Sequence, residues 1–138
     1  MMIYVNGQDI ARLGLGSLKD GRWLQGPELL EVRPEHYLAT LDTWLAKFNI
    51  KRTDIVGFVL VKGPGSATSL RTSHALVNAL AFALGVQVVS LEKDPAAADN
   101  DILKTLADHA PHPFALPTYA HSPNITKTNR DALKRKKV

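Results

Sequence analysis

The residues best suited to chemistry form a short turn, Gly63-Pro64-Gly65-Ser66. The preceding run "IVGFVLV" is typical of a strand buried on both faces, and the following stretch to Gly85 is typical of a helix. A strand-to-helix turn can bind a phosphate, because free N–H groups at a helix N-terminus point at the anion. Gly63, Gly65 and Ser66 are therefore candidate anion-binding residues.

The turn lacks three motifs that would give it a phosphate-binding or nucleophilic role. The Walker pattern needs Lys and Ser or Thr after its last glycine, but Ser69-Leu70 stands there. The dinucleotide fingerprint lacks its third glycine, and Gly-x-Ser-x-Gly is excluded because Pro64 and Thr68 occupy the glycine positions. The alternative is a tight strand-to-helix joint with Ser66 as the N-cap.

The other polar residues give little support for catalysis. His109-x-x-His112 is broken by Pro111 and lacks nearby carboxylates, so no metal site is predicted. Asn6 ends the first predicted strand, where a nucleotide-hydrolysing fold would place an acid, and an amide cannot act as a base. The sequence therefore predicts no catalytic residue, metal or cofactor.

The elements that position these residues follow the order β-β-β-α-β-α-β. Three short β segments come first, with a hairpin turn at Asp20-Gly21 and a bulge or edge at Gly26-Pro27. Pro34 opens the first helix, and Gly85 caps the second before the strand "VQVVSL". We expect an α/β fold with a five-stranded mixed sheet, the fourth and fifth strands parallel to the first.

Composition restricts the class of protein. The 138 residues are enough for one compact domain, and 45% hydrophobic with 22% charged residues is typical of a globular chain. The absence of cysteine excludes disulfides and thiolate metal sites and fits an intracellular setting. We predict no signal peptide and no membrane span, and hence a cytoplasmic protein.

The second helix carries more apolar surface than a two-layer domain normally leaves on an exposed helix. Its polar residues Arg71, His74 and Asn78 form one narrow stripe, and almost all its other residues are apolar or small. The helix is either buried within the domain or covered by another chain. The second possibility predicts these partner-binding residues: Arg71, His74, Ala75, Asn78 and Phe82, with His36, Thr40 and Thr43 of the first helix.

The last twelve residues, "KTNRDALKRKKV", are strongly basic. Such a tail is either a solvated, mobile terminus or a segment that contacts RNA phosphates or an acidic partner. Its basic side chains are Lys127, Arg130, Lys134, Arg135, Lys136 and Lys137.

The turn and its helix, "KGPGSATSLRTSHALVNALAFALGVQVVSLE", resemble the signature of the TsaB (YeaZ) family. The residues that match are Gly63, Pro64, Gly65, Ser66, Thr68, Leu70 and Arg71, whereas Ala67 replaces the usual Phe and Ser69 the usual Gly. The resemblance covers Pro34 to Leu91 and is weak before it. It implies one lobe of an actin-like, RNase H-like fold.

The resemblance also implies a role. TsaB is a non-catalytic subunit that pairs through its N-terminal-lobe helices with the catalytic subunit TsaD. With the ATPase TsaE, they form N6-threonylcarbamoyladenosine at position 37 of tRNA. TsaB also forms homodimers through the same helices. By this resemblance the chain is an accessory subunit, with contact between its basic tail and tRNA as a further expectation.

The chain departs from the family pattern in its length and in Asn6. The expected domains are a TsaB-like lobe over 1–92, a short helix with a proline-rich segment over 93–126 in place of the second lobe, and a basic tail over 127–138. One lobe has no interlobe cleft for ATP. The alternatives are a small actin-like nucleotide-binding enzyme that uses the Gly63–Ser66 loop, and a stand-alone regulatory homodimer.

Overall fold

The computed structural model describes residues 1–92, 106 and 109–118. They form a mixed sheet with strand order β3-β2-β1-β4-β5-β6. The strands are β1 (Met2–Asn6), β2 (Arg12–Lys19), β3 (Arg22–Glu31), β4 (Gly57–Val61), β5 (Gln87–Leu91) and β6 (Pro111–His112). The helices are α1 (Tyr37–Lys47) and α2 (Ala67–Leu84), with single 3-10 turns η1 (Pro34–His36) and η2 (Arg52–Asp54).

The sheet confirms the expected architecture. Strand β1 pairs antiparallel with β2 and parallel with β4, and β5 continues the parallel part. Asp20 and Gly21 both have positive φ, 54° and 75°, as a type I′ hairpin turn requires. Gly26-Pro27 lies in a bulge of the edge strand β3, where the pairing is irregular.

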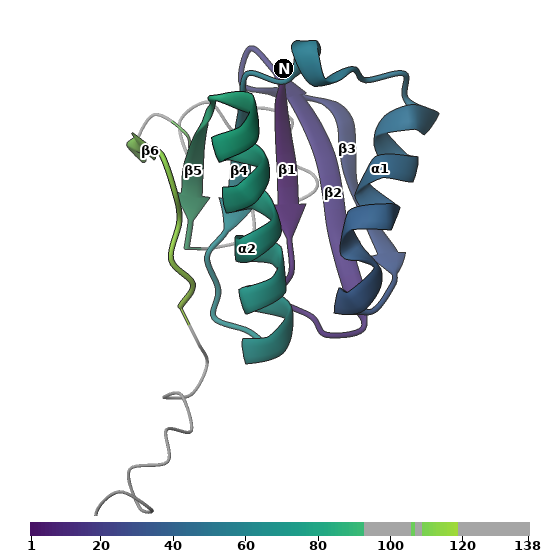
Figure 1. Ribbon diagram of the computed structural model, residues 1–138, viewed down its shortest axis with the longest axis vertical. Helices are drawn as coiled ribbons and strands as arrows, with labels where there is room; N and C mark the ends of the chain where they lie inside the picture. The colour runs from purple at the N-terminus through teal and green to yellow at the C-terminus, as the bar shows by residue number, and fades with distance from the viewer. Residues whose placement is uncertain (93–105, 107–108, 119–138) are drawn as a thin grey trace, which may run out of the picture.

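Both helices lie on the same face of the sheet, as Figure 1 shows. Pro34 begins η1, which leads directly into α1, and Gly85 ends α2 in the left-handed conformation at φ 68°. The main core fills the space between helices and sheet. It includes Ile3, Leu15, Leu41, Trp44, Phe58, Leu60, Val77 and Ala81. A second cluster on the other face includes Tyr4, Leu18, Val59, Val61 and Leu91, with Trp23 and Leu106 against it.

The prediction of five strands was one short. Residues 109–118, which we call the C-terminal strap, run beside β5 and α2 (Figure 1), and two of them form β6. β6 pairs antiparallel with β5 through Val88 and Val89. A two-residue strand in a proline-rich segment shows no alternation of apolar and polar residues, so no sequence pattern predicts it. The predicted short helix, apart from Leu106, and the basic tail lie outside the described residues.

Candidate functional site

The Gly63–Ser66 turn lies where ligands usually bind in an open α/β sheet. Strands β1 and β4 are parallel neighbours in the sheet. After β1 the chain continues to β2 toward one edge of the sheet, and after β4 it continues to β5 toward the other edge. The carboxyl ends of two such strands flank a crevice that can hold a ligand. Ser66 occupies the N-cap position of α2 as predicted, but its side chain makes no capping hydrogen bond. A nucleotide would have to use the backbone N–H groups of this turn.

Gln8 fills the turn from the loop after β1. Its side-chain Nε2 donates to the carbonyl of Pro64 at 2.8 Å, and its own carbonyl accepts the Ser66 N–H at 3.0 Å. A Cβ atom on Gly65 would lie 2.6 Å from the Gln8 carbonyl oxygen, so the two loops are in direct contact. The Ser66 N–H is therefore already used within the chain. The geometry favours the strand-to-helix joint over a phosphate cradle.

Asn6 has a structural role in the same loop. It is buried, its Oδ1 accepts the N–H of Gln8 at 3.0 Å, and its Nδ2 donates to the Tyr4 hydroxyl at 3.2 Å. The side chain therefore holds the loop that fills the turn. No group of three or more metal-ligating side chains occurs within the described parts of the chain. Nor is any helix there long and apolar enough to cross a membrane.

His74 and Asn78 do not lie on the outer surface of α2, where the interface prediction needs them. His74 is 3% exposed and its Nδ1 lies 2.7 Å from the Leu70 carbonyl oxygen, which fixes the proton on Nδ1. Asn78 binds both main-chain groups of Ala115, accepting its N–H at 2.8 Å and donating to its carbonyl at 2.9 Å. Two of the three residues of the predicted polar stripe, His74 and Asn78, therefore pack toward the sheet and the strap.

The burial of His74 makes the stability of the fold depend on pH. Loss of hydration lowers the pKa of His74 below its ordinary value of 6.5, the hydrogen bond to Leu70 opposes this, and the charge of Lys62 adds to it. Below pH 6.5 the unfolded chain therefore binds a proton that the folded chain does not.

We therefore expect the free energy of unfolding to fall as the pH is lowered from 7 through 6.5. The variant His74→Leu has no titrating group at this position, so its free energy of unfolding should depend less steeply on pH. Urea unfolding of both proteins between pH 5 and 8 measures the difference. Equal slopes in the two proteins would show that His74 does not titrate differently in the folded and unfolded chains.

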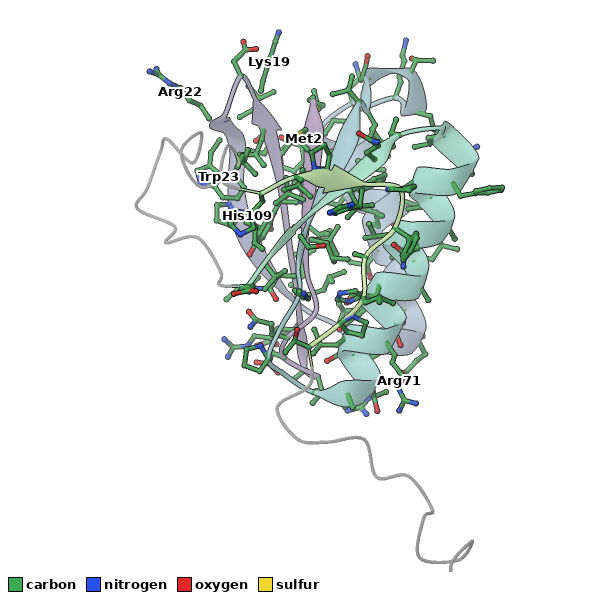
Figure 2. The ribbon with its side chains drawn as sticks, turned by 90° about the vertical axis from the view of Figure 1, so that its left-hand side faces the viewer. Met2, Lys19, Arg22, Trp23, Arg71 and His109 are labelled. Atoms are coloured by element: carbon green, nitrogen blue, oxygen red, sulfur yellow. The ribbon has the colours of Figure 1, made fainter. Side chains whose placement is uncertain are left out.

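The remaining predicted interface residues lie in three separate places on the two helices. Arg71, Ala75 and Phe82 are exposed along α2, and Phe82 is 89% exposed. Figure 2 shows Arg71 pointing away from the protein near the N-terminal end of α2. Thr40 and Thr43 instead line a groove of about 310 Å³ between α1 and β3, together with Glu28, Leu30, Ala39, Trp44 and Lys47. His36 is exposed at the start of α1.

Two sets of exposed apolar residues were not predicted from the sequence. A groove of about 150 Å³ runs between α1 and α2, and Leu38, 61% exposed, lies on its α1 side. Its α2 side is formed by Leu80, Ala83 and Leu84. On the strap, Phe114 and Leu116 are exposed on either side of the buried Ala115. The helical spacing of Leu38 indicates an apolar face of the helix. The local sequence does not show whether such a face is covered by the core or borders an open groove.

The comparisons with known proteins agree with this fold. A profile of the family TsaD, described as tRNA N6-adenosine threonylcarbamoyltransferase, matches residues 34–129. No curated protein matches the chain. Two solved structures align with a TM-score of 0.55, 21% identity and 65% of this chain covered: "YeaZ from Pseudomonas aeruginosa" and an uncharacterised protein with similarity to peptidase YEAZ from Pseudomonas aeruginosa.

At 21% identity these structures support the fold alone. The aligned part also corresponds to only 42% of each YeaZ chain, less than half its length. The family profile, in contrast, extends over more than half of the present sequence and includes the turn, α2 and the strap. The chain therefore belongs to the TsaD family, and its fold is the α/β, RNase H-like fold of YeaZ.

Proposed function

We propose that the chain is a non-catalytic accessory subunit that binds a TsaD-type partner in the synthesis of N6-threonylcarbamoyladenosine on tRNA. The observation that carries the proposal is the exposed apolar face of α2. Phe82, at 89% exposure, is the most exposed large apolar residue among those described. Aromatic side chains that project from a surface in this way are typical anchors of protein interfaces.

The proposed partner surface extends to both sides of Phe82. Ala75 and Ala79 lie next to it on the outer face of α2, are exposed, and are small enough to let a partner helix approach closely. Leu38 and the groove between α1 and α2 continue the surface on one side. The strap continues it on the other, because Asn78 holds Ala115 against α2 and the exposed Phe114 and Leu116 flank that contact.

The geometry of the turn supports an accessory role over the nucleotide-binding alternative. Gln8 occupies the place of a ligand at the carboxyl ends of β1 and β4, and Asn6 holds Gln8 there. Family membership alone does not decide between the two, since the family is described by an enzymatic activity. A homodimer through the same α2 face, and assembly with a TsaE-type ATPase, remain compatible with the accessory role.

Reconstitution tests the proposed function. The cognate TsaD-type protein and unmodified tRNA are incubated with ATP and the threonylcarbamoyl precursor system, with and without the chain, and the modified nucleoside is quantified by mass spectrometry. We expect modification to require the chain, and calorimetry of the chain alone with ATP and magnesium to show no binding. Stoichiometric nucleotide binding would instead favour the small actin-like enzyme.

A further inference from the structure

Positive charge gathers at one end of the lobe. At this end lie the hairpin between β2 and β3, the end of α1 at Lys47, and η2, which leads into β4. The hairpin and η2 are neighbours because Met2 pairs both with Leu18, next to the hairpin, and with Gly57, the first residue of β4. Five of the nine Lys and Arg residues in the described part of the chain belong to this end: Lys19, Arg22, Lys47, Lys51 and Arg52.

Acidic side chains do not balance this charge. Of the eight Asp and Glu residues in the described ranges, only Asp20 and Asp54 lie at this end, so five positive charges face two negative ones. Asp54 is used by its own chain, since its Oδ2 accepts the N–H of Lys51 at 2.9 Å. None of the five basic side chains forms an ion pair with another described residue, whereas Arg33 pairs with Glu35 at the opposite end. The excess positive charge is therefore available to an anionic partner.

Lys19 and Arg22 form the centre of this surface. They face each other directly as the pair of β2 and β3 next to the hairpin turn. Like charges directly opposite each other on two strands repel, which costs stability. A hollow of about 520 Å³ lies beside them, lined by Lys19, Asp20, Arg22, Trp23 and Leu24. An anion bound between the two cations would remove the repulsion that the fold itself leaves in place.

The hollow combines this charge with a fixed aromatic ring. Trp23 is half-buried and packs edge-on against Tyr4, with 5.1 Å between the ring centroids, so the indole is held beside the two cations. Figure 2 shows Lys19 and Arg22 projecting from the hairpin tip, at the opposite end of the protein from Arg71. Cationic groups bind phosphate, and an aromatic wall contacts the sugar or base that accompanies it in a nucleic acid.

We propose that this end of the lobe binds the phosphate backbone of RNA, with Lys19 and Arg22 as the central contact and the basic residues of 47–52 extending it. Several cations spread over one end can neutralise successive phosphates. The exposed large apolar residues at this end of the described chain are Leu24 and Val56. They offer too little apolar surface for the core of a protein interface or for insertion into a membrane. That the RNA is tRNA rests on the proposed function.

Fluorescence anisotropy with a labelled, unmodified tRNA transcript tests the surface on the whole chain. The test variant changes Lys19, Arg22 and Lys51 to glutamine. We expect it to weaken binding at least about 5-fold near 0.1 M salt, and the dependence of log Kd on log salt to become shallower by about 2, since each lost phosphate contact contributes about 0.7–0.9. Because the variant removes the repulsion between Lys19 and Arg22, urea unfolding should show no loss of stability.

The matched control removes the same charge from the opposite end of the lobe by changing Arg12, Arg33 and Arg71 to glutamine. Arg12 pairs with Glu31 at the far end of β2, and Figure 2 shows Arg71 at that end of the protein. Both variants keep residues 127–138, so any contribution of those basic residues is the same in each. We expect the control to bind the transcript within about 2-fold of the unmodified chain, because charges far from the contact are screened by salt.

Equal losses in both variants would overturn the proposal, as would an unchanged Kd in the test variant. An unrelated hairpin RNA of similar length should bind with similar affinity and show the same loss, since contacts to phosphates carry no sequence information. Binding to phosphatidylserine vesicles or to a polyglutamate peptide, without binding to either RNA, would also overturn it. The test variant should still form the complex with the TsaD-type partner, so a failure here leaves the proposed function unaffected.

Discussion

Replacing Phe82 with lysine is expected to weaken the complex with the TsaD-type partner by at least about 30-fold, which corresponds to a loss of about 2 kcal/mol. Phe82 is 89% exposed in the isolated chain, so its replacement removes almost no contact within the fold. Lysine in the last turn of α2 also interacts favourably with the helix dipole, so the helix should remain stable. Calorimetric titration of the partner measures the change in Kd.

Leu29→Lys is the matched control for this variant. Leu29 is 61% exposed and also apolar, but it lies on edge strand β3 beside Gly14, on the sheet face opposite the helices. We expect Leu29→Lys to leave the partner affinity unchanged. If both variants bind like the unmodified chain, the partner surface does not include Phe82.

Replacing Gly65 with alanine is expected to lower the free energy of unfolding by about 2–3 kcal/mol. The added Cβ would lie 2.6 Å from the Gln8 carbonyl oxygen and 2.8 Å from its Cα, and both are backbone atoms that cannot rotate away. The turn or the loop after β1 must therefore shift, which strains the hydrogen bonds between Gln8, Pro64 and Ser66. Urea unfolding followed by circular dichroism measures the loss.

Gly26→Ala provides the comparison, because nothing lies within 4 Å of a Cβ placed there. We expect this change to alter the stability by less than about 1 kcal/mol. A similar small effect at Gly65 would show that the two loops do not pack as closely as the structure has them. If the Gly65→Ala variant bound ATP although the unmodified chain does not, the turn would be a nucleotide site that Gln8 covers in the unmodified chain.

Most of the fold could be predicted from local signals. The hairpin was predicted from Asp20-Gly21, the start of the first helical segment from Pro34 and the end of α2 from Gly85, and each of these positions depends on a residue's own backbone preference. The parallel arrangement of β1, β4 and β5 followed from the order of strands and helices. β6 was missed because its pairing with β5 depends on contacts distant in sequence.

The candidate site was less predictable for the same reason. The helical wheel placed Arg71, His74 and Asn78 in one stripe, but it contains no information on which neighbour covers each edge of that stripe. The strap covers the Asn78 edge and the sheet side buries His74, so Arg71 alone of the three remains exposed. Gln8 was not singled out at all, since its hydrogen bonds cross to residues 64 and 66.

Size-exclusion chromatography with light scattering shows whether the chain and a TsaD-type protein form a complex that depends on Phe82. Three samples are compared: the chain alone, the chain with the cognate TsaD-type protein, and the Phe82→Lys variant of the chain with the same TsaD-type protein. We predict a complex with the summed mass of the two proteins, formed by the unmodified chain and lost in Phe82→Lys. Separate elution of the two unmodified proteins at concentrations near 10 μM, where a Kd of about 1 μM gives a mostly formed complex, would contradict it.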